Sequence, residues 1–168
     1  MMERARIFAM KSHEGQTRKY SGRPYFSHPE LVANILKYLT TDEDLIAAAY
    51  LHDVLEDAGV SLQELQRRFG ERVAGLVWEL TSDSEQIQMM GKAAYLANKM
   101  NLMSDEAFLI KLADRLDNLH DLSAADEEFR NRYLHQTREI LHSLNRNLTP
   151  EQEYLLSKIQ AILDVYSE

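Results

Sequence analysis

Apolar residues recur at helical spacing along almost the whole of this sequence. In residues 106–122 the leucines stand three or four positions apart, at Leu109, Leu112, Leu116 and Leu119. This spacing places them on one face of a helix. No segment alternates apolar and polar residues with period two over a length that indicates a strand. The sequence therefore predicts an all-α fold.

Capping residues and turn formers predict where the helices lie. Thr149, followed by Pro150 and Gln152, has the pattern of a capping box with proline at the first helical position. Ser61 and Glu64 form a second such box, and Thr41 is a plausible N-cap. The helices we expect span residues 1–13, 29–39, 42–57, 61–69, 71–81, 85–100, 106–122, 126–147 and from 150 onward. Residues 14–27 are expected to form a loop.

Length and composition narrow the class of protein. The 168 residues fit one domain spanning 1–168. The sequence has no cysteine, which excludes disulfides, a thiolate nucleophile and cysteine-ligated zinc. With no apolar run near 18 residues and a charged N-terminus, we expect no membrane span, no signal peptide and a cytoplasmic location.

The formal net charge of −8 argues against a broad surface for nucleic acid. A small anionic substrate would need a local cluster of basic residues to overcome the field of the whole protein. The sequence gives no indication of the oligomeric state.

A polar group interrupts an apolar helical run in the stretch "AYLHDVLEDAG", residues 49–59. On a helix, His52 and Glu56 stand one turn apart, as do Asp53 and Asp57. A buried carboxylate is costly unless it is paired or binds a metal. These four residues alone support two interpretations equally: a metal site, or the solvent-facing edge of an ordinary helix.

Two further segments carry residues that can bind a metal. Asp114 lies in an apolar run with Asn118 one turn later, and His28 stands at the entry of the helix that begins at Pro29. Taken alone, Asp114 is more simply explained by an ion pair with Arg115, Arg18 or another base, and His28 by an ordinary polar contact. Taken together, the segments give an H…HD…D set, which suits Mn²⁺, Fe²⁺, Co²⁺ or Zn²⁺ and leaves positions for water and substrate.

This arrangement resembles the HD superfamily of metal-dependent phosphohydrolases, which are all-helical. Three segments narrow the resemblance to the hydrolase domain of the RelA/SpoT enzymes: "HEGQTRKYSGRPYFSHPELVANIL", "LHDVLED" and "FLIKLADRLDNLHDL". They occur in the family's order, and the resemblance covers roughly residues 1–145. Because the chain has no room for a synthetase or regulatory domain, we expect a stand-alone small alarmone hydrolase, similar to the animal SpoT homologue.

The resemblance implies roles for specific residues. The family's metal positions, usually occupied by Mn²⁺, fall on His28, His52, Asp53 and Asp114. Glu56 and Asp57 match the pair of carboxylates that positions and activates the attacking water.

The family's substrate contacts fall on another set of residues. Arg18 and Lys19 match a pair that holds the substrate phosphates, although outside the motif a solvated basic loop would be the simpler explanation. Asn118 matches a residue that contacts the nucleoside. Tyr133 matches a tyrosine that reaches the substrate in the animal homologue, and Lys92 stands at the place of a basic segment that contacts phosphate.

The implied activity is metal-dependent hydrolysis of guanosine 3′,5′-bis(diphosphate), ppGpp, and of pppGpp, to GDP or GTP plus pyrophosphate. The sequence departs from the family at Ala58, where relatives often have threonine, and at "LTSDSE", residues 80–85. These departures leave open another nucleotide substrate, such as the 2′-phosphate of NADPH. A module that binds the alarmone without turnover is the third alternative, against which the Glu56–Asp57 pair argues.

Overall fold

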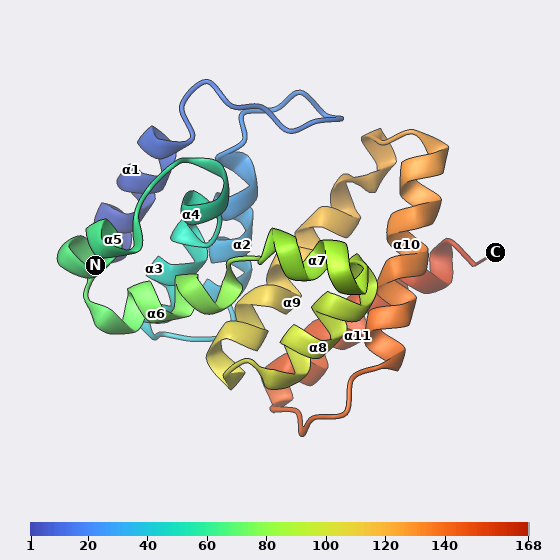
Figure 1. Ribbon diagram of the computed structural model, residues 1–168. Coiled ribbons are helices and arrows are strands. Elements are labelled where there is room, and N and C mark those ends of the chain that lie inside the picture. Colours follow the sequence, from blue (N-terminus) through green and yellow to red (C-terminus); the bar gives the residue numbers. More distant parts are fainter. Residues whose placement is uncertain (168) are drawn as a thin grey trace. The chain divides into compact units, whose positions relative to one another are not determined.

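The computed structural model of this chain describes residues 1–167, and every regular element within them is a helix (Figure 1). A single isolated antiparallel bridge pairs Thr17 with Pro24 in these residues. The predicted all-α fold is therefore confirmed. No helix in the described part of the chain combines the length and apolar character needed to cross a membrane. The cytoplasmic location stays a prediction.

The chain divides into two compact units, one from Met1 to Thr81 (unit 1) and one from Ser82 onward (unit 2). A single domain over residues 1–168 would require the two units to fold and act together, and it stays a prediction.

Unit 1 is built around one short helix. Its helices are α1 (Met2–Ser12), α2 (Ser27–Lys37), α3 (Glu43–Leu51), α4 (Val54–Asp57), α5 (Leu62–Phe69) and α6 (Glu71–Leu80). Helix α3 packs against α1, α2 and α6, and all seven residues from Leu45 to Leu51 are buried. A helix that is apolar on all sides is suited to such a central position.

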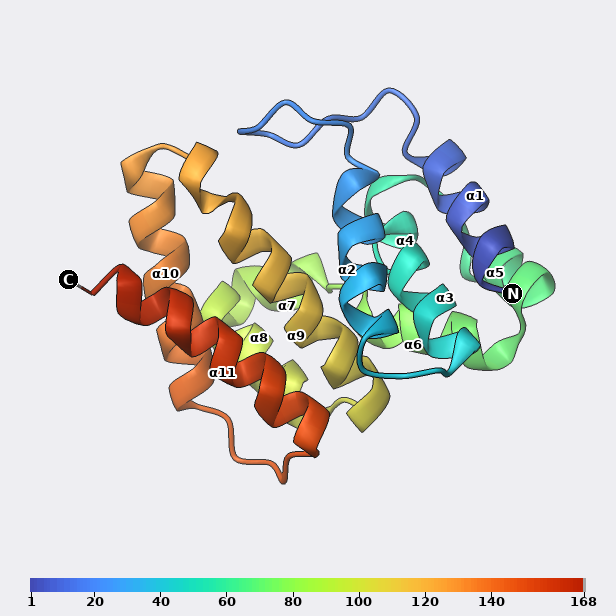
Figure 2. The same cartoon turned by 180° about the vertical axis from the view of Figure 1, so that it is seen from behind.

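Unit 2 contains the longest helices. They are α7 (Ser84–Met90), α8 (Lys92–Leu102), α9 (Asp105–His120), α10 (Glu127–His142) and α11 (Pro150–Val165), with a short 3₁₀ helix, η1 (Asp121–Ala124), after α9. Helix α9 packs against α11 (Figure 2), and α8 packs against α10. All four leucines of the predicted stripe on α9 are buried, so that face forms part of the core.

Several helix boundaries differ from the predictions. The single helix predicted over residues 42–57 is wrong, because α3 ends at Leu51 and α4 begins at Val54. The N-cap of α3 is Asp42 rather than Thr41, and its carboxylate accepts from the backbone N–H groups of residues 44 and 45.

Three further segments are divided, shorter or shifted. Residues 85–100 form two helices, which separate at Gly91, where φ is +81° and favours glycine. The helix predicted to end at residue 147 ends at His142. Helix α2 begins at Ser27, which places His28 inside its first turn. The capping box at Thr149 and Gln152 is confirmed.

The buried face of α9 makes a prediction about stability. Leu112 is 0% exposed, whereas Leu102, at the end of α8, is 77% exposed. We expect Leu112→Ala to lower the free energy of unfolding by about 2–5 kcal/mol, because it leaves a cavity. Leu102→Ala should change it by less than about 0.5 kcal/mol. Urea unfolding followed by circular dichroism measures both, and equal effects would contradict the placement of this face.

Candidate active site

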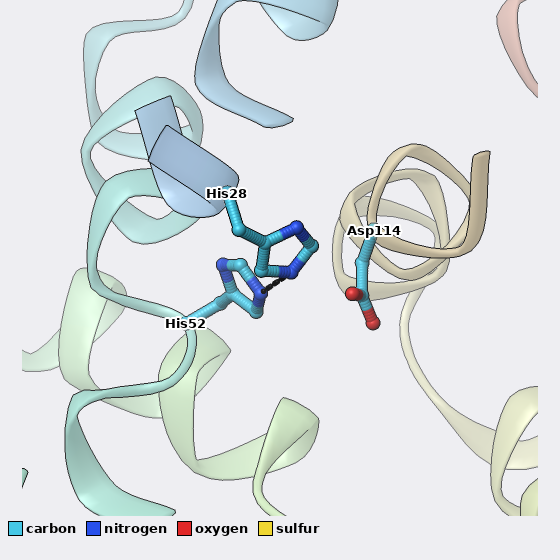
Figure 3. A group of neighbouring side chains, drawn as sticks. All are labelled: His28, His52 and Asp114. Atoms are coloured by element: carbon cyan, nitrogen blue, oxygen red, sulfur yellow. Dashed lines mark hydrogen bonds between the residues drawn. The ribbon is translucent and has the colours of Figure 1, made fainter. Parts of the chain in front are cut away.

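Two buried histidines of unit 1 face each other. His28 lies in the first turn of α2 and His52 caps the C-terminus of α3, and each is 3% exposed. Their Nε2 atoms are 3.3 Å apart (Figure 3). The Nδ1 atom of His52 lies 2.7 Å from the carbonyl oxygen of Ala49. Because a carbonyl only accepts, Nδ1 of His52 carries a proton, so that in the neutral form of the ring the lone pair is on Nε2.

Asp53 brings a carboxylate to the same point. Its Oδ2 atom is 3.1 Å from Nε2 of His52 and 3.7 Å from Nε2 of His28. A divalent ion with ligands at about 2.1 Å would hold neighbouring ligand atoms roughly 3.0–3.4 Å apart, from octahedral to tetrahedral geometry. Two of the three donor-to-donor distances, 3.1 and 3.3 Å, fall in this range, and the third, 3.7 Å between His28 and Asp53, is a few tenths of an ångström longer. The donor atoms have the chemistry that fits such an ion.

The interruption between α3 and α4 makes this convergence possible. On a continuous helix, consecutive side chains diverge by about 100° and cannot meet at one point. At Asp53 the backbone has φ −104° and ψ −3°, the sparsely allowed region where many active-site residues lie. The helix that the sequence predicted through this segment would have separated His52 from Asp53, and the observed turn brings them together.

Two more carboxylates stand beside Asp53 on α4. Carboxylate oxygens of Asp53, Glu56 and Asp57 lie within 4.8 Å of one another. Partial burial raises the pKa of Asp57, and the negative charges of Asp53 and Glu56 raise it further. A hydrogen bond from Tyr25 and the nearby His13 act in the opposite direction. Such a carboxyl group can hold a proton more readily than an isolated aspartate, as a general base must.

The two basic residues predicted to bind phosphate, Arg18 and Lys19, lie on the loop between α1 and α2. Arg18 is buried, and its backbone N–H donates to the carbonyl of Arg23 at 2.8 Å. Lys19 is exposed, with its Nζ atom 5.1 Å from the centre of the Tyr20 ring. The loop thus carries one buried and one exposed cation at neighbouring positions. Their predicted role as phosphate ligands stays a prediction.

In unit 2, Asp114 is buried and both of its carboxylate oxygens have partners. Lys111 Nζ lies 2.7 Å from Oδ2, and Asn118 Nδ2 donates to Oδ1 at 2.9 Å. Figure 3 draws the Asp114 side chain on α9. Arg115, which we considered as a partner for Asp114, instead donates to the hydroxyl of Thr137 at 2.8 Å. Among the described contacts, Lys111 therefore supplies a cation that offsets the buried carboxylate.

Tyr133 joins this cluster from α10. Its ring lies 4.8 Å from the guanidinium carbon of Arg115, and Asn118 contributes a hydrogen bond. Burial raises the pKa of the Tyr133 phenol, while Arg115 and Asn118 act to lower it. Unit 2 thus gathers Asp114, Asn118 and Tyr133 in one place. The remaining candidate, Lys92, is the exposed first residue of α8.

Sequence reasoning assigned no role to Lys111, although a pattern was present. Lys111 precedes Asp114 by three positions on a helix, which places the two side chains on the same face. Burial lowers the pKa of Lys111, but the charge and hydrogen bond of Asp114 raise it above its usual value. Lys111 therefore stays charged and balances the carboxylate.

The buried pair makes a prediction about stability in chelated protein. Lys111→Met should lower the free energy of unfolding by about 2–4 kcal/mol, since it leaves a buried carboxylate without its cation. Arg132→Met is the matched control, because Arg132 and Glu128 form an exposed pair one helical turn apart. Urea unfolding in the presence of a chelator compares them. If both variants unfold at the same urea concentration, the Lys111–Asp114 pair contributes nothing to stability.

Comparison with known proteins places this geometry in a family. The sequence profile described as "HD domain" matches residues 5–148. The chain is 40% identical over 150 residues to a guanosine-3′,5′-bis(diphosphate) 3′-pyrophosphohydrolase of Aquifex aeolicus, covering 88% of this chain and 21% of that protein. It is 36% identical over 153 residues to a probable enzyme of the same name from Synechocystis sp., covering 86% of this chain and 20% of that protein. The chain thus spans about a fifth of the length of these curated relatives.

A solved structure is similar over nearly the whole chain. It is described as a metazoan ortholog of SpoT that hydrolyzes ppGpp and plays a role in starvation responses, and it is 29% identical with a TM-score of 0.84. The match covers 98% of this chain and 94% of that one. These relatives confirm the resemblance to the RelA/SpoT hydrolases that the three motifs indicated. Since the family profile matches well over half of its length, this chain belongs to the HD domain family.

Proposed function

We propose that this protein hydrolyses ppGpp and pppGpp, releasing pyrophosphate and leaving GDP or GTP. The observation that carries the proposal is the convergence of His28 Nε2, His52 Nε2 and Asp53 Oδ2, with mutual distances of 3.1, 3.3 and 3.7 Å. The carboxylates of Glu56 and Asp57 stand beside it. The names of the similar proteins support the choice of substrate.

The metal ligands in this proposal are His28, His52, Asp53 and Asp114, and the ion is Mn²⁺. Two imidazoles with carboxylates form a donor set of intermediate hardness, which supports a first-row divalent ion. The buried carboxylate of Asp114, held by Lys111 and Asn118, is of the ligand type that the set still needs. Such an ion, when bound, makes water more acidic and polarises a phosphate group.

The protein's own side chains carry the other roles. Glu56 and Asp57 orient the attacking water and accept its proton as it adds to the phosphorus nearest the ribose. The bond that breaks joins this phosphorus to the 3′ oxygen, which leaves with GDP or GTP and takes up a proton from solvent to become the 3′ hydroxyl. Arg18 and Lys19 stabilise negative charge on the phosphates, as does Lys92.

The nucleoside contacts in this proposal come from unit 2. Asn118 offers an amide and Tyr133 an aromatic ring and a hydroxyl, and the hydrogen bond between them fixes both. An aromatic ring and an amide suit the stacking and edge contacts that a nucleobase offers.

Turnover of a nucleotide panel tests the function. Chelated protein receives Mn²⁺ with ppGpp, pppGpp or NADPH, and released pyrophosphate and phosphate are measured. We expect Mn²⁺ to restore release of pyrophosphate with GDP or GTP from the guanosine substrates. Turnover of NADPH alone would reject the alarmone assignment, and tight binding of ppGpp without product would indicate a binding module.

The role of Asp53 predicts the effect of removing its carboxylate. Asp53→Ala should abolish high-affinity Mn²⁺ binding and turnover, because one of three converging donors is lost. Asp164→Ala, on α11, is a matched control that removes an exposed carboxylate. Isothermal titration with Mn²⁺ and a turnover assay check both variants, and full activity in Asp53→Ala would overturn the ligand assignment.

The role of Glu56 predicts a different pattern. Glu56→Gln keeps the size of the side chain but cannot accept the proton of water. We expect Mn²⁺ affinity to stay within a few-fold of wild type and kcat to fall by about 10²–10⁴-fold. Glu139→Gln, on the exposed side of α10, should leave both unchanged. A kcat for Glu56→Gln within a few-fold of wild type would remove Glu56 from the mechanism.

A further inference from the structure

Part of the first motif has no role in the mechanism above. The segment "HEGQTRKYSGRPY" contains His13, Gln16 and Tyr25 in addition to the basic residues. These three side chains lie on the loop before α2 and at the end of α1, and all belong to unit 1. Their contacts lead to the turn that carries Asp53 and Asp57.

The hydroxyl of Tyr25 stands between two carboxylates. It donates to Oδ2 of Asp53 at 2.7 Å and lies 3.3 Å from Oδ2 of Asp57. A phenol has a single proton, so the shorter contact is the stronger, charge-assisted hydrogen bond. The oxygen of Asp53 that receives it is the same one that faces both histidine Nε2 atoms.

Gln16 and His13 connect Tyr25 to the segment from Asp53 to Asp57. The amide of Gln16 donates to the backbone carbonyl of Asp57 at 2.7 Å, and its oxygen accepts from Nδ1 of His13 at 2.8 Å. The backbone N–H of Tyr25 donates to the carbonyl of Gln16 at 2.9 Å. The ring of Tyr25 packs against His13, with centroids 4.9 Å apart. We call these three residues the His13–Gln16–Tyr25 clamp.

The clamp contacts both ends of the Asp53–Asp57 turn, which consists of the short helix α4 and its N-cap residue Asp53. Tyr25 holds it through the side chain of Asp53, and Gln16 holds it through the backbone at Asp57. His13, against which the ring of Tyr25 packs, is itself 2% exposed and so is held firmly in place. Partners that orient metal ligands typically change metal affinity or activity by 10–100-fold when they are removed.

We propose that Tyr25 is a positioning residue, whose hydroxyl holds the Asp53 carboxylate toward His28 and His52 and keeps Asp57 beside it. The expected effect of Tyr25 on turnover rests on the proposed function. The expected effect on metal binding does not, since Tyr25 contacts the metal ligand Asp53 directly. Tyr25 touches neither the phosphate nor the attacking water in this role. Its effect passes through Asp53.

Tyr25→Phe tests the proposal, because it removes the hydroxyl and keeps the ring that packs on His13. Mn²⁺ binding to substrate-free protein is measured first, by isothermal titration or by the loss of the free Mn²⁺ signal in electron paramagnetic resonance. We expect an affinity about 10–100-fold weaker than wild type. At saturating Mn²⁺, we expect kcat to fall by about 10-fold or more, with KM for ppGpp within about threefold.

Tyr38→Phe is the matched control, since Tyr38 lies in the same unit and is 91% exposed. It should leave Mn²⁺ affinity, kcat and KM at wild-type values. Circular dichroism establishes that both variants are folded. A Mn²⁺ affinity of Tyr25→Phe within twofold of wild type overturns the proposal, whatever the rate of turnover.

The two proposals can fail separately. If wild-type protein binds Mn²⁺ but does not turn over ppGpp, the proposed function is wrong, and the Mn²⁺ affinity of Tyr25→Phe still decides the role of Tyr25. If wild type turns over ppGpp and Tyr25→Phe binds Mn²⁺ as tightly, the function stands and the positioning role is wrong.

Discussion

The turn between α3 and α4 is the feature on which the candidate site depends. Helix α3 is buried on every side, so the position of its last residue is fixed by packing rather than by a solvated end. The carbonyl of Ala49, one turn earlier, sets the tautomer of His52. The chain then leaves helical geometry at Asp53, and two adjacent side chains reach a single point. A continuous helix could supply either residue to that point, but not both.

The carboxylates of both candidate clusters have local partners, although the chain as a whole is acidic. Asp114 lies beside Lys111 on its own helix, and the half-buried Asp53 lies beside two imidazoles and a phenol. Asp114 is 6% exposed, and the side chain of Asp53 is 16% exposed. A carboxylate withdrawn from water in this way gains from a bound cation, which agrees with the proposed role of both as ligands.

The fold class and most helix positions could be predicted from the sequence, because helical periodicity and capping patterns are local. The polar residues of the candidate site were indicated by the motifs. The interruption at residues 52–53 was not predictable in this way, since Leu51, Val54 and Leu55 continue the apolar pattern across it. Asp42 rather than Thr41 caps α3, and Arg72, 30 positions away, donates to the Asp42 carboxylate. That contact is tertiary and has no counterpart in local spacing.

The loop between α1 and α2 shows that a sequence motif can contain residues that support the ligands in addition to the ligands themselves. A loop is a poor support for a site that needs sub-ångström placement, because loops are mobile and solvated. Here the loop is tied to the Asp53–Asp57 turn through both a side chain and a backbone carbonyl. Two turns with positive φ, at Gly15 and Gly22, let the chain make these contacts over few residues. Within this partly exposed loop, His13, Gln16 and Tyr25 therefore support the neighbouring carboxylates.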